Sequence, residues 1–284
     1  MAQDISSKFN KIEEFITQTI GLEQVKATLI SFLAVLKFQE KLKGKIATQT
    51  PNLHMVFRGN AGTGKTTVAV KLAELYGELG FLGVTDGKPA KLTVLNSANL
   101  LTYDATTKAK KLVEEAMGGI LLLDEAYAIT ESSSGVGEDV IAVLLTEMEQ
   151  HQNELAVIFA GYTEKMYKFM TFNPGLHSRI GANLTFEDYT PDELLYILLQ
   201  KVQKEGFNVT EEAKANMLDV FRDATRYNDF GNGRFAMRFF QEIITEHSIR
   251  TANSFDDAEL LTITGADVTR KIIEKVLKSA NFKF

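Results

Sequence analysis

Apolar residues recur at two different spacings along this chain, and the spacings separate predicted helices from predicted strands. In residues 21–45 and 67–80 they return every three or four positions, which predicts amphipathic helices. Short apolar runs bounded by glycine or polar residues predict strands, and they occur in the order LHMVF, KLTVLN, GGILLLDEA, LAVIFAGY and NLTFEDY. Because helical stretches separate these strands, the pattern predicts an α/β fold with a parallel sheet covered on both faces.

Beyond residue 190 the pattern becomes helical. Helical spacing returns in three stretches, residues 191–205, 210–226 and 233–252. A brief apolar run, LLTIT, then precedes a closing helix predicted from Asp267. Thr190, followed by Pro191 and Glu193, has the composition of a helix start. We therefore place the boundary between an α/β domain and a smaller helical domain close to Thr190.

Composition and charge exclude several classes of protein. The 284 residues are 45% hydrophobic and 24% charged, as in an ordinary folded protein. With no Cys and only 4 His, a metal is expected to be bound by oxygen. The apolar runs are far too short for a membrane span, and the acidic N-terminus lacks a signal core, so we expect a cytoplasmic protein. A net charge of -6 without a basic block argues against nucleic acid as a partner.

The glycine-rich segment GNAGTGKT, residues 59–66, matches the phosphate-loop pattern GxxxxGK[ST] between a predicted strand and a predicted helix. Glycines let such a loop curl so that backbone N–H groups point at phosphate oxygens, and the helix N-terminus adds partial positive charge. We expect Lys65 to reach the β- and γ-phosphates of ATP and the Thr66 hydroxyl to bind Mg²⁺. The predicted nucleotide-binding residues here are Asn60, Ala61, Gly62, Thr63, Gly64, Lys65, Thr66 and Thr67.

The run GILLLDEA supplies the second half of the predicted site. Its apolar residues place Asp124 and Glu125 at the end of a buried strand, where open α/β sheets bind ligands. We expect Asp124 to hold Mg²⁺, directly or through water, and Glu125 to polarise the attacking water. Together with the phosphate loop, this pair favours nucleotide hydrolysis over nucleotide storage.

With these motifs in place, the chain resembles the AAA+ ATPases. More narrowly, it is similar to the CbxX/CfqX family, which includes red-type Rubisco activase, stage V sporulation protein K and the ATPase domain of type VII secretion. The matching stretches, in family order, are GLEQVK, LHMVFRGNAGTGKTTVA, GGILLLDEAYAI, LAVIFAGYTEKM, NPGLHSRI, LTFEDYTPDEL and FGNGRF. The resemblance implies an N-terminal extension (1–19), a P-loop NTPase α/β domain (20–190) and a helical lid (191–284). It also implies a hexameric ring with ATP bound between subunits.

The same resemblance implies roles for single residues. Ile20 and Gly21 should lie against the adenine, and either Tyr162 or Thr163 should occupy the sensor-1 position after the AVIFAGY strand. The choice between Tyr162 and Thr163 stays open at this point.

Two arginines complete the implied site. Arg179 of NPGLHSRI resembles the arginine finger that reaches a neighbouring subunit's γ-phosphate, and Arg234 of FGNGRF resembles sensor 2. A guanidinium suits this role because negative charge accumulates on the phosphoryl oxygens in the transition state. His177 stands where the family often has another arginine, and we expect it to be structural.

The segment NLLTYDATTKAKKLVEEA departs from the family pattern. Members usually carry a glycine-aromatic-hydrophobic-glycine loop here that lines the central pore and grips a peptide, whereas this segment lacks both glycines. Three interpretations remain for Tyr103. It is the pore aromatic on a shortened loop, or the grip is lost and the ring acts through another surface, or the side chain packs under the next helix.

These observations predict an ATP-hydrolysing remodelling factor, similar to a chaperone or activase, that acts on a protein client as a ring. The sequence does not select Rubisco or any other client. The alternative is a nucleotide-gated scaffold, or a non-pulling subunit that lends Arg179 to a paralogue in a mixed ring. A DNA-loading AAA+ protein is disfavoured by the acidic charge balance and by the absence of a helix-turn-helix or basic arm.

Overall fold

The computed structural model describes residues 13–14, 16–17, 19–42, 45, 52–83, 89–132 and 135–269. The chain divides into two compact units. Unit 1 contains Met1–Gly59 and Gly64–Glu187, and unit 2 contains Asn60–Thr63 and Asp188–Phe284. Most of the predicted extension at 1–19, and all but the first three residues of the helix predicted from Asp267, lie outside the described residues.

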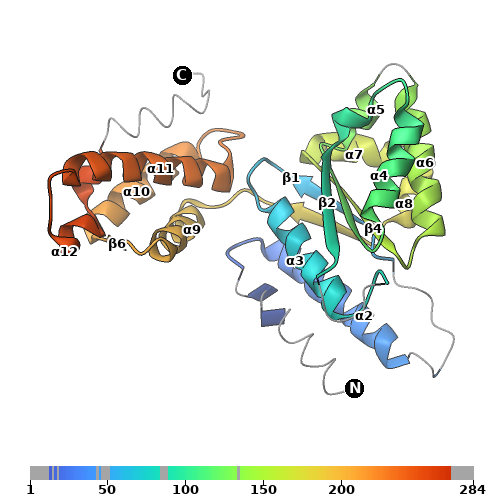
Figure 1. Ribbon diagram of the computed structural model, residues 1–284, viewed down its shortest axis with the longest axis horizontal. Helices are drawn as coiled ribbons and strands as arrows, with labels where there is room; N and C mark the ends of the chain where they lie inside the picture. The colour runs from blue at the N-terminus through green and yellow to red at the C-terminus, as the bar shows by residue number, and fades with distance from the viewer. Residues whose placement is uncertain are drawn as a thin grey trace. The chain divides into compact units, whose positions relative to one another are not determined.

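Unit 1 is built on a parallel sheet of five strands in the order β2-β3-β4-β1-β5 (Figure 1). All of the paired strands run parallel. This confirms the predicted fold class. The strands are β1 (Met55–Gly59), β2 (Lys91–Asn96), β3 (Gly119–Asp124), β4 (Leu155–Gly161) and β5 (Ala182–Phe186).

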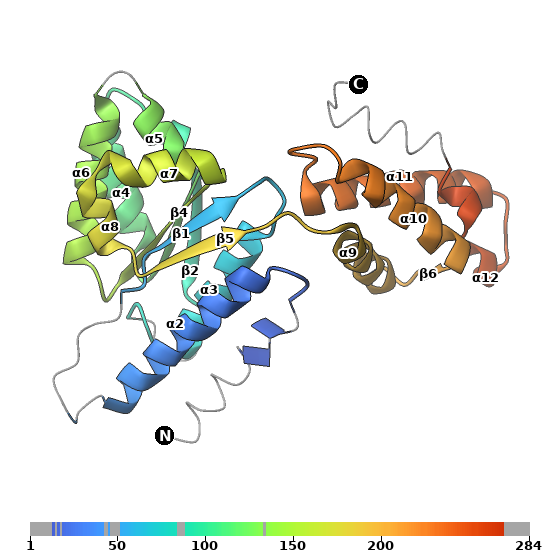
Figure 2. The ribbon, with the colours of Figure 1, turned by 180° about the vertical axis from the view of Figure 1, so that it is seen from behind.

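Helices cover both faces of this sheet, as predicted. In the two opposite views, α2 and α3 lie on one face, and α4 to α8 lie on the other (Figures 1 and 2). Their bounds are α2 (Glu23–Leu42), α3 (Lys65–Glu78), η1 (Ser97–Leu100), α4 (Ala105–Ala116), α5 (Tyr127–Glu131), α6 (Val136–Gln150), α7 (Thr163–Phe172) and α8 (Pro174–Arg179).

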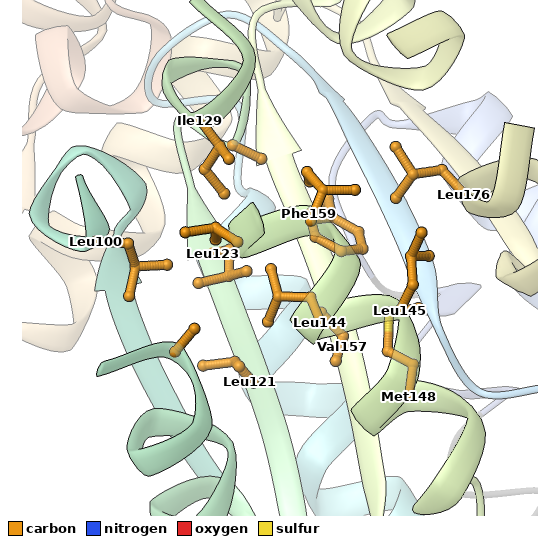
Figure 3. Close-up of a cluster of buried hydrophobic side chains, with 14 of the residues drawn as sticks. Leu100, Leu121, Leu123, Ile129, Leu144, Leu145, Met148, Val157, Phe159 and Leu176 are labelled. Carbon is orange, nitrogen blue, oxygen red and sulfur yellow. The ribbon is translucent and has the colours of Figure 1, made fainter. Parts of the chain in front are cut away.

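A cluster of buried hydrophobic side chains fills the space between the sheet and α4 to α8. Leu121 and Leu123 of β3 and Phe159 of β4 point from the sheet towards Leu144 of α6 (Figure 3). Alternate strand residues face opposite sides of a sheet, so the residues between them, such as Leu122, pack on the other face. Both faces are therefore apolar, which explains why the central strands appear in the sequence as continuous apolar runs.

Unit 2 is mainly helical. The Thr190 side chain caps the first helix, and Glu193 bonds back to the Thr190 backbone, which confirms the predicted helix start. A short parallel pair of strands was not predicted. The elements are α9 (Pro191–Lys204), β6 (Asn208–Val209), α10 (Glu211–Ala224), α11 (Asn232–Thr251), α12 (Asp257–Leu260), β7 (Thr262–Ile263) and η2 (Gly265–Asp267).

A buried ionic cluster holds the C-terminal part of unit 2 against α11. The Asp267 side chain is fully buried and accepts hydrogen bonds from Arg250 Nε at 2.7 Å and from the Thr264 N–H at 2.8 Å. His247 Nδ1 lies 3.1 Å from the same carboxylate. Burial opposes ionisation of Asp267, but the Arg250, Thr264 and His247 hydrogen bonds outweigh it, so the carboxyl pKa lies below its ordinary value.

Replacing Asp267 with alanine should lower the free energy of unfolding by about 2 kcal/mol, because it removes a fully buried carboxylate that accepts hydrogen bonds from Arg250 and from the Thr264 N–H. A depressed carboxyl pKa stabilises the folded state above the pKa of the unfolded chain, and this stabilisation is lost as the pH falls through the folded-state value. The difference between wild type and variant should therefore shrink in acid. Urea titrations at neutral and acidic pH measure it. Asp219→Ala, which removes an exposed i,i+3 ion pair, should change stability by less than about 0.5 kcal/mol.

Among the described residues, no helix combines the length and the apolar character needed to cross a membrane.

Candidate nucleotide site

The phosphate loop joins β1 to α3. Gly62 and Gly64 have φ values of +77° and +95°, a region that glycine adopts without steric cost. Gly64 is the N-cap of α3 and provides no side chain to bond the first N–H groups of the helix, so those donors stay available to an anion. Lys65 Nζ donates to the Gly59 carbonyl at 2.7 Å, and the Thr66 side chain is exposed. The local geometry therefore suits a bound polyphosphate.

The predicted hydrolytic pair lies at the end of β3. Every residue of this strand before Asp124 is buried, so the strand is fixed on both faces. The Glu125 N–H donates to Asp124 Oδ1 at 3.1 Å, and Glu125 itself has a φ of +53°. Residues other than glycine rarely adopt positive φ, and such strain concentrates at functional sites. The backbone thus turns sharply where the proposed base leaves the sheet.

Asn96 is a site residue that the sequence interpretation missed. It ends β2 in register with Asp124, and its Nδ2 donates to Glu125 Oε2 at 2.9 Å. Its Oδ1 accepts the Ala98 N–H at 3.1 Å and so caps η1. One amide group therefore contacts both the proposed base and the next segment of the chain. The signal was present in the sequence, since KLTVLN ends in a polar residue at the same edge of the predicted sheet.

The sensor-1 candidates follow β4, which lies between β3 and β1 in the sheet. The carboxyl end of β4 therefore falls between Glu125 and the start of the phosphate loop. Tyr162 and Thr163 are both partly exposed there, so the geometry does not choose between them. Tyr127, also missed in the sequence, packs its ring 6.2 Å from that of Tyr162. Burial, followed by the Glu125 charge, raises the Tyr127 pKa to about 12.

The two candidate arginines lie in different units. Arg179 ends α8 in unit 1, where its guanidinium pairs with Glu149 and donates to the Gly175 carbonyl at 3.3 Å. Its Nε is buried and has no partner in the described structure. Arg234 lies on the first turn of α11 in unit 2 and is exposed. His177 is exposed on α8, so the expectation that it is a structural residue is not supported by burial.

The remaining predicted residues lie at element ends in unit 1. Ile20 and Gly21 are partly exposed and directly precede α2. Nothing in the described structure tests their predicted contact with adenine. Asp124 and Thr66 provide one carboxylate and one hydroxyl. This donor set fits Mg²⁺, which is usually bound through one or two carboxylates together with phosphate oxygens and water.

Tyr103 stands at the tip of the segment that connects η1 to α4. Its relative exposure is 101%, so the interpretation that it packs under the next helix is wrong. Buried Leu100 and Ala105 fix the two ends of the segment. Within it, Thr102 Oγ1 donates to Asp104 Oδ1 at 2.7 Å, and outside it Lys108 Nζ donates to the Asn99 carbonyl at 2.7 Å. The tyrosine is therefore presented to solvent by an internally bonded loop.

Comparisons with known proteins agree with the geometry. A family model described as "ATPase family associated with various cellular activities (AAA)" matches residues 55–187, and an AAA lid domain model matches residues 190–278. The fold and the phosphate loop thus define a P-loop ATPase of the AAA+ class.

Curated relatives narrow this class. A CfxQ homolog from Pyropia yezoensis is 35% identical over 95% of this chain and 89% of its own length. A chloroplastic ribulose bisphosphate carboxylase/oxygenase activase from Cyanidioschyzon merolae is 34% identical over 96% and 92%. The chromosomal CbxX protein of Cupriavidus necator is 33% identical over 88% and 81%. The chain belongs to the CbxX/CfxQ family of AAA+ ATPases.

Solved structures share the fold. The RuvB Holliday junction branch migration motor of Thermotoga maritima superposes with a TM-score of 0.61 over 93% of this chain and 71% of its own. At 18% sequence identity, this similarity supports the fold and carries no inference about DNA.

Proposed function

We propose that this protein is an ATP-hydrolysing AAA+ remodelling factor, similar to an activase, that works as a ring and acts on a protein client. The observation that carries the proposal is the double contact of Asn96. Its amide nitrogen bonds Glu125, the candidate base. Its amide oxygen caps η1, which leads into the loop that carries exposed Tyr103. A change at the γ-phosphate that moves Glu125 would therefore also move Asn96, and with it η1, which precedes the Tyr103 loop.

Hydrolysis on this proposal uses the residues of unit 1 in distinct roles. Lys65 and the N–H groups of the phosphate loop hold the polyphosphate, and Glu125 takes the proton of the attacking water. Tyr162 or Thr163, at the end of the intervening strand, orients that water or the γ-phosphate. Thr66 and Asp124 would hold Mg²⁺, which would supply positive charge to the phosphate oxygens. Asn96 releases or restrains Glu125, and so sets when the base is available.

The ring is proposed on the surroundings of Arg179. Arg179 is tied to Glu149 on its own α6 and lies at the end of a short helix. We propose that it acts instead on ATP held by a neighbouring subunit, in a hexamer of like chains or in a mixed ring with a paralogue. Arg234 would approach the same phosphate from the lid. Neutralising developing charge in this way is worth about 10³-fold or more in rate.

The client is proposed to be a protein gripped by Tyr103. An exposed aromatic ring binds varied peptides because it offers a large contact area at low entropic cost. The named activase relative makes ribulose bisphosphate carboxylase/oxygenase the first client to test. A protein motor should hydrolyse ATP faster in the presence of its client, whereas a nucleotide-gated scaffold should be indifferent to it.

Tyr103→Ala should keep basal ATP hydrolysis within about twofold of wild type and lower client reactivation by about tenfold or more. The reason is that the aromatic side chain of Tyr103 is proposed to contact the client and not the nucleotide. Reactivation assays with the inhibited carboxylase, or with any client captured from lysate, measure this. Tyr196→Ala, which removes another exposed tyrosine, is the matched control and should have no effect. Full remodelling by the Tyr103 variant would overturn the assignment of this loop as the grip.

A further inference from the structure

Three consecutive carbonyl groups of the phosphate loop accept hydrogen bonds from one cluster in unit 2. Asn232 Nδ2 donates to the Ala61 carbonyl at 3.3 Å, and the Gly233 N–H donates to the Gly62 carbonyl at 3.0 Å. The Tyr189 hydroxyl donates to the Thr63 carbonyl at 3.4 Å. Donors and acceptors all belong to the same compact unit, which includes Asn60–Thr63. The backbone carbonyls of residues 61, 62 and 63 therefore each have a hydrogen-bond donor from this cluster.

Asn232 is the centre of this cluster. It is completely buried, and both polar atoms of its side chain are bonded. Its Oδ1 accepts the Tyr189 N–H at 2.8 Å, and its Nδ2 donates to Asp188 Oδ1 at 2.7 Å in addition to Ala61. Its φ is +50°, a region that asparagine tolerates better than most residues. A buried amide is normally bonded in this way, and here its partners are the loop carbonyl of Ala61 and the two residues at the start of the helical unit, Asp188 and Tyr189.

Asp188 extends the cluster to Asn60, the first residue after the opening glycine of the phosphate-loop pattern. Its two carboxylate oxygens accept from Asn60 Nδ2 at 3.1 and 3.0 Å. Gly62 is fitted just as closely, since a Cβ at that position would lie 2.1 Å from the Gly231 carbonyl oxygen. Any side chain at Gly62 would therefore force the loop away from the cluster. The conformation of Asn60–Thr63 and that of the Asp188–Gly233 cluster depend on each other.

We propose that Asn232, together with Asp188 and Tyr189, is a positioning cluster that holds the phosphate-loop carbonyls outward, so that the N–H groups stay turned towards the β-phosphate of a nucleoside di- or triphosphate. This inference rests on the proposed role of residues 59–67 in ATP binding. A backbone whose N–H groups converge on an anion needs other partners for its carbonyls. Burial raises the Tyr189 pKa to about 12, so its hydroxyl remains a donor at neutral pH.

The FGNGRF motif thus contributes more than an arginine. Arg234 is exposed and is the candidate for the γ-phosphate, whereas Asn232 is buried and supports the loop from behind. Asn232 touches no phosphate, so it is a positioning residue. Its contribution to nucleotide affinity should be the same for ATP and ADP, because both carry a β-phosphate. It should not contribute to the affinity for AMP.

The test is the affinity of the full chain for fluorescent ADP and ATP. Asn232→Gly is the informative variant, because glycine adopts the observed φ without strain and only the side-chain bonds are lost. We expect ADP and ATP to bind about tenfold more weakly, because the Ala61 carbonyl loses its donor and Asp188 and Tyr189 lose the side chain that they share. The KM for ATP should rise by a similar factor, and kcat should change by less than about threefold. AMP binding should not change.

A matched control is Asn216→Ala, which removes a side-chain amide bonded to a backbone carbonyl, that of Val268, elsewhere in unit 2. It should leave nucleotide affinity unchanged. If Asn232→Gly fails to fold, Tyr189→Phe removes a single hydroxyl and should weaken ADP about two- to fivefold. Wild-type affinity in a folded Asn232→Gly or Tyr189→Phe protein would overturn the inference. Failure of the wild type to bind ATP, or unchanged binding by Lys65→Ala, would instead overturn the proposed function.

Discussion

Replacing Glu125 with glutamine is expected to lower ATP hydrolysis by at least about 10²-fold while ATP binding stays within about threefold of wild type. Glutamine has the size of glutamate but cannot take a proton from water. Its side-chain oxygen can still accept the bond that Asn96 Nδ2 donates to Glu125 at 2.9 Å. The strained turn after β3 and the phosphate loop should therefore keep their geometry.

Two measurements check this expectation. Phosphate release reports hydrolysis, and fluorescent-nucleotide titration reports binding. Glu131→Gln is the matched control, because Glu131 is an exposed carboxylate in the same unit that pairs with Lys165, and it should hydrolyse ATP at the wild-type rate. An undiminished rate for Glu125→Gln would show that another group acts as the base. The same inactive variant, loaded with ATP in lysate, is also the reagent for capturing the client.

Arg179→Ala should lower the hydrolysis rate by about 10³-fold in the assembled protein, because the variant loses a cation at the transition state. The loss should appear in kcat and should leave ATP affinity nearly unchanged. Arg222→Ala, which removes a surface arginine paired with Asp219, is the matched control. A full hydrolysis rate in the Arg179 variant would remove it from the proposed site.

Mixing experiments distinguish action within a subunit from action on a neighbour. A Lys65→Ala chain cannot hydrolyse its own ATP but keeps Arg179, so adding it to Arg179→Ala chains should restore part of the activity. No recovery, in a mixture shown by native mass spectrometry to form joint rings, would contradict the proposal that Arg179 acts on the adjacent subunit. Assembly itself is reported by the same mass measurement.

The parts of the structure that could be predicted depend on local pattern. The apolar run of β3 is buried on both faces, so its composition alone indicated a central strand. The helix start at Thr190 was predictable for a similar reason, since the capping residues are neighbours in sequence. The strands β6 and β7 were missed because each has two residues and they pair across a long separation in sequence.

The residues of the candidate site also differ in whether the sequence could reveal them. The phosphate loop and the Asp124–Glu125 pair are contiguous motifs, and the sequence located both. Asn96 and Asn232 act through partners far away in the chain, Asn232 through Ala61 at a separation of 171 residues. The polar end of a predicted strand was a signal for Asn96, whereas no local pattern in the sequence brings Asn232 to the phosphate loop. For Tyr103, the sequence left three interpretations, and the exposure of the side chain removed one of them.

The double contact of Asn96 has a consequence for how this protein can change by mutation. Asn96→Asp would retain the acceptor that caps η1 but would place a second negative charge beside Glu125. Asn96→Ala would remove both contacts in one step. Because a single amide makes both contacts, any substitution that removes the Asn96 side-chain amide entirely changes the surroundings of Glu125 and the cap of η1 together. On the proposed role of Asn96, loss of this one side chain would therefore alter the timing of hydrolysis and the geometry of the Tyr103 loop in a single mutational step.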